Sequence, residues 1–237
     1  MAFDARFALE TLLPINNAAY QFSWNQMITL PSGWEQIATI SIDQSVIDKE
    51  TASGLAKIAI TEDSNWGVAA RNGDTAVIAI RGTDTKHQWL EDFDALAVPV
   101  SHNGWWVHHG FEEVYQSIRT SFEAAYRAVS SAPMLYITGH SLGAALALLA
   151  AVDTNNPNTC TFAGPRVFGA GAKFNCFRVV NHWDIVPNVP VPPLYGHVGT
   201  AINIDGGFTL DAAVAHSLDQ GYAPGLKKLL GVAARTA

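Results

Sequence analysis

The pattern of apolar and polar residues changes near residue 109. Before this point the apolar stretches are short, and apart from helical spacing over 6–20 and about 84–96 they are strand-like. They predict a helix over 6–20, broken or bent near Pro14, and strands over 35–42, 55–60, 66–71 and 75–80. Asn72-Gly73, the preferred pair for a two-residue type I′ hairpin, joins the last two strands. The sheet is therefore expected to begin antiparallel.

After residue 109 helical and strand patterns alternate. The apolar residues of 111–130 have the spacing of a long amphipathic helix. The elements expected after it are strand 133–138, helix 142–152, strands 159–163, 176–181 and 198–204, and helices near 211–215 and 224–234. This alternation predicts an α/β fold in which a mainly parallel central sheet, with antiparallel N-terminal strands, has helices on both faces. No internal repeat or linker interrupts the sequence, so we expect a single domain over residues 1–237.

The candidate chemistry begins at Gly139-His140-Ser141-Leu142-Gly143, a G-x-S-x-G pattern between a short apolar strand and an apolar helix. This context is typical of the nucleophile elbow of an α/β-hydrolase, where a sharp strand-to-helix turn exposes a serine. The two glycines would let the strand and helix backbones approach each other. Ser141 is therefore the candidate nucleophile, at the edge of the sheet where ligands bind in such folds.

A serine nucleophile needs a histidine base and a carboxylate that orients it, and in this fold both follow the serine, acid first. Asp184 is the preferred acid because it follows an apolar strand and precedes a proline-stiffened loop, which is a rigid place to anchor an imidazole. The weaker candidates are Asp153, at the end of the helix after Ser141, and Asp205 and Asp211, in turn-like surroundings.

Three histidines follow Ser141, and the choice of base lies between two of them. His182 is only two residues before Asp184 and is expected to point elsewhere. His216 lies beyond the last strand, in a loop setting typical of the base, and is preferred on chain order. His197 stays open, because the connection 187–196 is short for a right-handed crossover and an antiparallel strand after it would bring His197 near the active edge.

The oxyanion that forms during acyl transfer needs hydrogen-bond donors. The elbow supplies one, the backbone N–H of Leu142. The second is expected from Thr83, which follows a strong apolar strand and Gly82 and has both an N–H and a hydroxyl to donate. The alternative for Thr83 is a threonine that merely ends a strand or caps a helix.

Composition limits the partners. The chain has 237 residues, of which 49% are hydrophobic and 15% charged, and a formal net charge of −7. This charge argues against nucleic acid and against electrostatic attraction to anionic lipid. No apolar run reaches the length of a transmembrane segment, about 18 residues. The first residues lack a signal-peptide pattern, which leaves a cytoplasmic protein or the mature form of a secreted one.

The two cysteines, Cys160 and Cys176, do not have metal-like spacing. Two separate buried thiols are the favoured interpretation, and a single disulfide is the alternative.

Together these motifs resemble the class 3 lipases, the fungal-type triacylglycerol lipases. The resemblance covers about residues 15–222 and is carried by Arg81-Gly82-Thr83, Trp89 to Asp92, His109-Gly110-Phe111, Gly139 to Gly143, Thr161 to Val167, Asp184 to Pro187, Tyr195 to Gly199, His216 and Tyr222. It implies an α/β-hydrolase fold without cofactor or metal, a triad of Ser141, Asp184 and His216, and oxyanion donors at Thr83 and Leu142. By the same resemblance His197 is a non-triad histidine near the site. Fungal members have a signal peptide and several disulfides that this chain does not show, which favours a bacterial-type or intracellular member.

The resemblance also implies a lid between Thr83 and His109. Over about 84–96, apolar residues that include Trp89, Leu90 and Phe93 have helical spacing, with acidic residues on the other side. Such a helix would cover an apolar acyl groove and contact substrate on opening, or it would stay packed on the body. Beyond it, Trp105-Trp106 is consistent with either an interfacial patch or ordinary core.

The expected function is that of a serine carboxylic-ester hydrolase that forms an acyl-enzyme on Ser141. Its expected substrate is triacylglycerol or another acyl ester, met at a lipid–water interface, and a monomer is assumed. Feruloyl esterase and phospholipase A1 activities on the same scaffold are alternatives. A non-catalytic lipase-like binding module is disfavoured because all triad residues are present.

Overall fold

The central sheet is mixed, with its antiparallel part at the N-terminal side. The computed structural model describes residues 2–23, 28–47, 51–61, 65–83 and 98–231. Its seven-stranded sheet has the order β1-β2-β3-β6-β7-β9-β11. These strands are β1 (Glu35–Ser41), β2 (Asn65–Asn72), β3 (Thr75–Ile80), β6 (Met134–His140), β7 (Thr159–Phe162), β9 (Phe177–Asn181) and β11 (Thr200–Ile204). β1, β2 and β3 pair antiparallel and every later pairing is parallel, which confirms the predicted arrangement.

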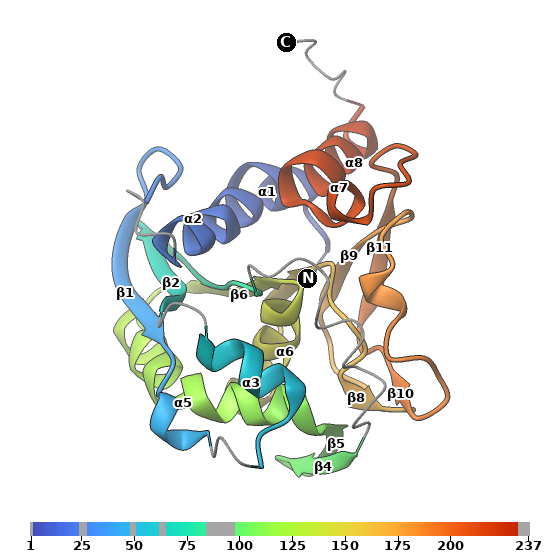
Figure 1. Cartoon of the computed structure of the whole chain (residues 1–237). Coiled ribbons are helices and arrows are strands. Elements are labelled where there is room, and N and C mark those ends of the chain that lie inside the picture. The colour runs from blue at the N-terminus through green and yellow to red at the C-terminus, as the bar shows by residue number, and fades with distance from the viewer. Residues whose placement is uncertain (1, 24–27, 48–50, 62–64, 84–97, 232–237) are drawn as a thin grey trace.

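Helices cover both faces of this sheet, as the alternating pattern predicts (Figure 1). One face carries α1 (Ala5–Phe7), η1 (Ala8–Leu12), α2 (Leu13–Ser23), α7 (Ala212–His216), η4 (Leu218–Tyr222) and α8 (Ala223–Leu229). The other carries α3 (Gly54–Thr61), α5 (His109–Val129) and α6 (Leu142–Thr154). Two short helices, η2 (Gln44–Val46) and η3 (Val186–Asn188), lie in connections.

Alternating side chains of β3 divide the core into two clusters. Ile78 and Ile80 belong to the cluster under α5 and α6, whereas Val77 and Ala79 belong to the cluster under the N-terminal helices and α8. Because successive side chains of a strand point to opposite faces, a strand buried on both sides is apolar throughout. This accounts for the unbroken apolar run of β3.

The helix is not broken at Pro14, and a π-helical turn lies just before it. Proline has no N–H to donate to the preceding turn. Just before it, the N–H of Leu13 bonds the carbonyl of Ala8, five residues back, and closes the wider π turn η1. The N-terminal helix therefore continues past Pro14 into α2.

Residues 55–60 form helix α3, so the predicted strand is wrong. The hydroxyl of Ser53 accepts the N–H of Ala56 at 3.2 Å, as an N-cap serine does. Leu55, Ala56 and Ala59 are buried together, which is a helical rather than an alternating spacing. The capping serine and the two alanines outweigh the strand preference of the β-branched residues.

The β2–β3 hairpin lies where it was predicted, but its turn is displaced by one residue. Asn72 pairs with Thr75, so the loop residues are Gly73 and Asp74. Of these two only Gly73, at φ +55°, has a positive φ, whereas a type I′ turn needs it at both positions. The predicted type I′ turn is therefore wrong.

A second, four-stranded sheet was not predicted. Its order is β10-β8-β5-β4, and its strands are β4 (Pro99–His102), β5 (Trp105–His108), β8 (Phe168–Gly169) and β10 (Tyr195–Gly196). Strands of two to four residues are too short to show an alternating pattern. Along β5, Trp105 packs against the core whereas Trp106 is 63% exposed, so the tryptophan pair divides between core and surface.

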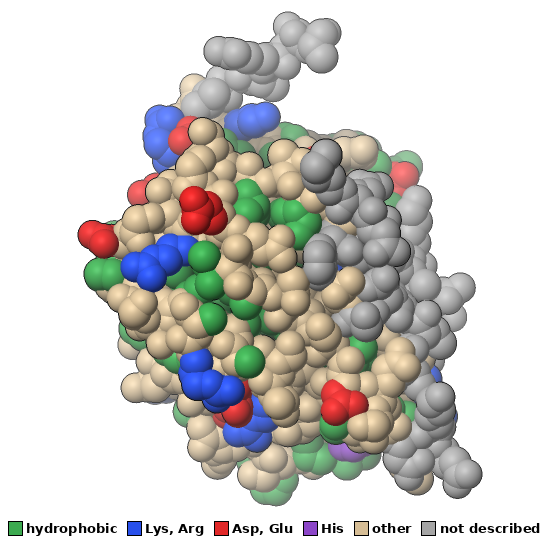
Figure 2. All heavy atoms as spheres, turned by 90° about the vertical axis from the view of Figure 1, so that its left-hand side faces the viewer, with side chains coloured by type: hydrophobic (Ala, Val, Ile, Leu, Met, Phe, Trp, Pro, Cys, Tyr) green, Lys and Arg blue, Asp and Glu red, His purple; other side chains and the backbone are tan. Residues whose placement is uncertain are grey.

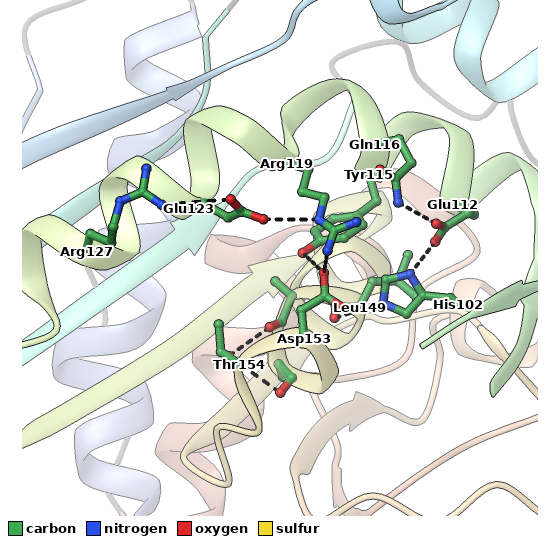
Figure 3. Close-up of polar contacts among 12 residues, drawn as sticks. His102, Glu112, Tyr115, Gln116, Arg119, Glu123, Arg127, Leu149, Asp153 and Thr154 are labelled. Atoms are coloured by element: carbon green, nitrogen blue, oxygen red, sulfur yellow. Dashed lines mark hydrogen bonds and ion pairs between the residues drawn. The ribbon is translucent and has the colours of Figure 1, made fainter. Parts of the chain in front are cut away.

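A polar cluster ties this second sheet to two helices (Figure 3). His102, at the end of β4, is buried between two carboxylates. Its Nδ1 lies 2.7 Å from Glu112 of α5, and its Nε2 lies 3.1 Å from Asp153 of α6. Asp153 also accepts the hydroxyl of Tyr115 at 2.9 Å and pairs with Arg119 at 3.3 Å.

The remaining surface and thiol features are simple. Acidic and basic side chains are intermixed on the face that carries the edge strand β1 (Figure 2). Cys160 and Cys176 are both buried free thiols, which confirms the favoured interpretation. Among the described helices, none combines the length and apolar character needed to cross a bilayer.

Candidate active site

The elbow is a sharp turn between β6 and α6. His140 is the last residue of β6, Ser141 has φ +61° and ψ −129°, and α6 begins at Leu142. A Cβ atom at Gly139 would collide with the carbonyl of Gly143, and one at Gly143 would collide with the carbonyl of Ile80. The two glycines therefore let β6, α6 and β3 pack backbone against backbone, and the serine bears a positive φ that is rare outside glycine.

Ser141 is held by its backbone while its hydroxyl is left for chemistry. Its N–H donates to the carbonyl of Phe162 on β7 at 3.1 Å. Its side chain makes no capping hydrogen bond to α6. The first N–H groups of a helix lack partners within the helix and carry a partial positive charge, so Leu142 N–H is suited to an anion beside Ser141.

The strand end at Thr83 lies beside the elbow. Because Ile80 pairs with Gly139, the residues that follow β3 run alongside His140 and Ser141. A Cβ atom on Gly82 would lie 2.9 Å from the Cβ of Ser141, so glycine permits this approach.

The Gly82–Thr83 peptide is oriented by a buried arginine. Arg81 Nη1 donates to the carbonyl of Gly82 at 2.8 Å, and the guanidinium lies over the Trp66 ring at 4.8 Å. In a trans peptide the C=O and N–H point in opposite directions, so the N–H of Thr83 points away from Arg81. The Thr83 hydroxyl oxygen is buried without a hydrogen-bond partner in the described part of the chain. Thr83 therefore has donors available for a substrate oxygen.

The structure brings Asp184 and His216 together. His216 Nδ1 donates to Asp184 Oδ2 at 2.9 Å, and the hydroxyl of Tyr222 donates to the same oxygen at 2.7 Å. The N–H of Val186 donates to Asp184 Oδ1 at 3.0 Å. Burial raises the pKa of Asp184, but the hydrogen bonds and charge of His216, together with Tyr222 and Val186, outweigh it and leave the pKa below its usual range. The carboxylate is thus ionised and bound by three donors.

The strand register places these groups at one edge of the sheet. Asn181 pairs with Ile204, so Asp184 and the segment leading to His216 leave β9 and β11 at the edge where β6 ends at Ser141. The amide of Asn181 donates to the carbonyl of Ala215 at 2.8 Å and fixes the end of α7 next to His216.

The chain also resembles known proteins in sequence and in fold. Residues 77–193 match the model of the family described as Lipase (class 3). The chain belongs to the class 3 lipase family.

The relatives of this class 3 lipase include curated plant proteins and solved fungal structures. Phospholipase A1-II 6 of Oryza sativa subsp. japonica is 31% identical over 204 residues, which cover 61% of this chain and 50% of that protein. The crystal structure of the lipase from Rhizopus microsporus var. chinensis is 25% identical, with a TM-score of 0.61 over 86% of this chain and 76% of that one. Lipase II from Rhizopus niveus, 22% identical with a TM-score of 0.64 over 86% of this chain and 81% of that one, shares the α/β-hydrolase fold. The chain spans about half the length of the curated relatives it matches.

In this class 3 lipase, the antiparallel alternative for the strand after His197 is wrong. β11 pairs parallel with β9, starting at Thr200 opposite Phe177, so the chain enters it at the edge opposite Ser141. His197 Nε2 donates to the carbonyl of Pro187 at 2.7 Å. Burial, with Arg178 and Arg166 nearby, lowers the pKa of His197 to about 4. Its imidazole therefore holds the connection 187–196 in place.

The other candidate residues lie as follows. Asp153 belongs to the His102 cluster, and the exposed Asp205 pairs with Lys228. The predicted lid residues Trp89, Leu90 and Phe93 lie outside the described residues, so their role stays a prediction. No group of three His, Cys, Asp or Glu side chains within the described ranges is arranged to hold a metal ion.

Sequence inspection assigned no role to three polar side chains that line the site: Tyr20, His140 and Asn181. His140 lies between two residues of the elbow, which was a signal of proximity though not of role. Tyr20, on α2, is 120 residues away from His140 in sequence, yet its hydroxyl lies 2.8 Å from His140 Nδ1. Only the folded sheet brings these two residues together.

Proposed function

We propose that this class 3 lipase is a serine carboxylic-ester hydrolase, with Ser141 as nucleophile, His216 as general base and Asp184 as the acid that orients it. One observation carries the proposal: Asp184 and His216 share a 2.9 Å hydrogen bond at the sheet edge where the elbow ends at Ser141. A buried carboxylate that accepts a hydrogen bond from Nδ1–H fixes the tautomer in which Nε2 carries no hydrogen and can accept a proton.

In the acylation half, Ser141 Oγ forms a bond to the ester carbonyl carbon while His216 Nε2 takes the hydroxyl proton. The carbonyl oxygen becomes an oxyanion that accepts from the N–H of Leu142 and from the N–H and hydroxyl of Thr83. Such preorganised donors are worth about 3–4 kcal/mol each in transition-state stabilisation. Asp184 stabilises the imidazolium that His216 becomes.

The intermediate then collapses. The bond from the carbonyl carbon to the alcohol oxygen breaks, and His216 gives its proton to the leaving alcohol. Water attacks the acyl-enzyme by the same route, with His216 as base, and releases the carboxylic acid and free Ser141.

The proposed substrates are acyl esters of glycerol, either triacylglycerol or phospholipid. The solved relatives named above are titled lipases, and the curated relatives carry the name phospholipase A1. Their names favour lipid esters over feruloyl esters. Phospholipase A1 activity is therefore the second candidate beside triacylglycerol hydrolysis.

A fluorophosphonate probe tests the enzymatic proposal directly. We expect the probe to phosphonylate Ser141 with loss of fluoride, and we expect Ser141→Ala to abolish labelling and lower kcat on p-nitrophenyl esters by roughly 10⁶-fold. Ser117→Ala is the matched control, because it removes a buried hydroxyl that bonds only its own helix, at 2.6 Å from the Val114 carbonyl. Wild-type turnover in Ser141→Ala would show that Ser141 is not the nucleophile. Neither labelling nor ester cleavage by the intact protein would leave a binding module as the better description.

A substrate panel decides among the esters. It comprises p-nitrophenyl esters of rising chain length, emulsified triacylglycerol, phosphatidylcholine and methyl ferulate. The proposal predicts that lipid esters are cleaved with a higher kcat/KM than methyl ferulate. Release of sn-1 fatty acid from phosphatidylcholine without cleavage of triacylglycerol would select the second candidate.

A further inference from the structure

Three hydrogen bonds run in series past the nucleophile. The N–H of Gly82 donates to the Tyr20 hydroxyl oxygen at 2.9 Å. The same hydroxyl lies 2.8 Å from Nδ1 of His140, and Nε2 of His140 lies 2.9 Å from the carbonyl oxygen of His216. The series thus begins one residue before Thr83, passes the residue before Ser141 and ends on the backbone of His216.

The proton order in this series follows from its acceptors. A carbonyl oxygen only accepts, so His140 Nε2 must carry a hydrogen. Burial lowers the pKa of His140 to about 3, and the charge of His216 acts in the same direction, so the ring is neutral and Nδ1 has no hydrogen. Tyr20 must then donate its hydroxyl hydrogen to Nδ1 while it accepts from Gly82. All three bonds are satisfied in this one tautomer.

His140 also bonds a backbone carbonyl at the end of α7 that has no hydrogen-bond partner within that helix. The last carbonyls of a helix have no intrahelical partner. At the end of α7, Asn181 bonds the carbonyl of Ala215 at 2.8 Å and His140 bonds that of His216 at 2.9 Å. The centroids of the His140 and His216 rings are 4.6 Å apart, so both the backbone and the ring of His216 contact His140.

We propose that His140, as a neutral Nε2–H imidazole, is a positioning residue that couples the Gly82–Thr83 strand end, through Tyr20, to the backbone of His216. The effect on turnover rests on the proposed function, whereas the hydrogen-bond series does not. Thr83, Ser141 and His216 come from three separate segments of the chain, and His140 with Tyr20 spans all three. A misplacement of about 1 Å at such a site costs about 100-fold in rate.

Neutrality is part of this role. During the proposed reaction His216 becomes cationic, and a second cation 4.6 Å away would oppose that step. A neutral imidazole supplies one acceptor and one donor without adding charge. The carboxamide of glutamine also offers both and is neutral at every pH, so His140→Gln is the conservative variant, whereas His140→Phe keeps a ring and loses both groups.

The first experiment measures kcat and KM per active site titrated with fluorophosphonate, which corrects for any unfolded fraction. We expect kcat to fall about 100-fold in His140→Phe and about tenfold in Tyr20→Phe, with KM unchanged within about twofold. His140→Gln should recover most of the loss. Because Tyr20 and His140 act in one series, the double variant Tyr20→Phe/His140→Phe should be no slower than His140→Phe within about twofold.

The control is Tyr115→Phe, which removes another buried hydroxyl, one that donates to Asp153 at 2.9 Å in the separate His102 cluster. It should leave kcat unchanged even if the melting temperature falls. Wild-type kcat in folded His140→Phe, or multiplicative effects of the two single changes in the double variant, would overturn the positioning role.

A second experiment tests the three hydrogen bonds without measuring turnover. Nitrogen NMR of ¹⁵N-histidine protein, assigned by loss of the signal in His140→Gln, should show a neutral Nε2–H ring from about pH 5 to 8. Tyr20→Phe should move the Nδ1 shift, since that nitrogen loses a hydrogen bond. Titration of His140 in this range, or an Nδ1–H tautomer, would refute the series. If the wild type neither reacts with fluorophosphonate nor cleaves esters, the proposed function fails, and the nitrogen shifts alone decide the inference.

Discussion

One oxygen of Asp184 receives two side-chain hydrogen bonds, from His216 Nδ1 and from the Tyr222 hydroxyl. Burial works against a charge on this carboxylate, and its donors outweigh burial, so its pKa stays below the usual range. Tyr222 is fully buried and lies in the turn that follows α7. It therefore fixes Asp184 from the same segment that carries His216.

Replacing Tyr222 by phenylalanine removes this donor with little change in volume. A hydrogen bond to a charged group is worth about 1.5–3 kcal/mol, and an acid held by fewer donors orients the imidazole less well. We expect kcat per titrated site to fall about tenfold with KM unchanged, measured on a soluble p-nitrophenyl ester.

The control for this change is Tyr195→Phe. Tyr195 is also buried, and within the described residues its hydroxyl has no hydrogen-bond partner. Its loss should leave both kcat and the free energy of unfolding near the wild-type values. Equal kcat in Tyr222→Phe and wild type would show that Tyr222 supports only the fold.

The role of a single residue can be predicted from the sequence when the fold fixes its position in chain order. The G-x-S-x-G pattern marks Ser141, and the order serine, acid, histidine confines the acid and the base to later residues, among which local context favours Asp184 and His216. His140 and Tyr20 have no such rule, since their roles come from a hydrogen bond between residues 120 positions apart. The roles of all five stay predictions until the variants are measured.

At the scale of elements, His102 joins β4 to α5 and α6 (Figure 3). Burial would lower the pKa of His102, but the hydrogen bond and charge of Glu112 and the charge of Asp153 outweigh burial and raise the pKa above its usual value of 6.5. A pKa that is higher in the folded state means that protonation stabilises the fold. This contribution is complete below about pH 6.5 and is lost as the pH rises through the folded pKa.

The His102→Gln variant should separate this contribution from other titrations. It leaves Glu112 without this cation, whereas Asp153 keeps its pair with Arg119, and breaking a buried pair costs at most about 3–5 kcal/mol. We expect the variant to be less stable than wild type at about pH 6, and the difference to be smaller at a pH above the folded pKa of His102, where the wild-type imidazole has lost its proton. Denaturant unfolding at the two pH values measures the difference.

Glu112→Gln provides the matched test of the charge itself. It keeps a hydrogen-bond acceptor beside His102 and removes one carboxylate. The folded-state pKa of His102 should then be lower than in wild type, and the free energy of unfolding should depend less steeply on pH. A difference between His102→Gln and wild type that is constant with pH would contradict a protonated His102.

The longest helices were predictable from the sequence, whereas the strands of the second sheet were not. α5 repeats an amphipathic pattern over 21 residues, and α6 is a continuous apolar run of small and aliphatic residues, so both helices are visible in the sequence. The two residues of β8 and the two of β10 have no period to detect, and they become strands only by pairing with β5 and with each other. In α3 a local cap, Ser53, outweighed the strand preference of the β-branched residues.

At the scale of the whole molecule, the parallel register assembles the site. β3, β6, β9 and β11 all deliver their carboxyl ends to one edge, so Thr83, Ser141, Asp184 and His216 follow four strands of a single sheet. Alternation of strands and helices was enough to predict this edge. The direction of β11 was left open by the sequence, because a short connection does not reveal how the chain returns to the far edge.

The net charge also acts at this scale. The chain has 14 lysines and arginines and 21 aspartates and glutamates, which give a formal net charge of −7 at pH 7. A protein of this charge is repelled by an anionic surface over a distance set by salt, about 30 Å at 0.01 M and about 3 Å at 1 M. If lipid is the substrate, the protein should approach zwitterionic surfaces more readily than anionic ones at low salt.

Vesicle binding by the Ser141→Ala variant tests this without hydrolysis. We expect weaker co-sedimentation with vesicles that contain phosphatidylglycerol than with pure phosphatidylcholine at about 0.01 M salt, and near equality at about 1 M, where charge is screened. Neutral vesicles should show little salt dependence and serve as the control. Stronger binding to the anionic vesicles at low salt would contradict this prediction. It would mean that a local basic surface, rather than the net charge, governs adsorption, because attraction between opposite charges strengthens binding at low salt and is screened at high salt.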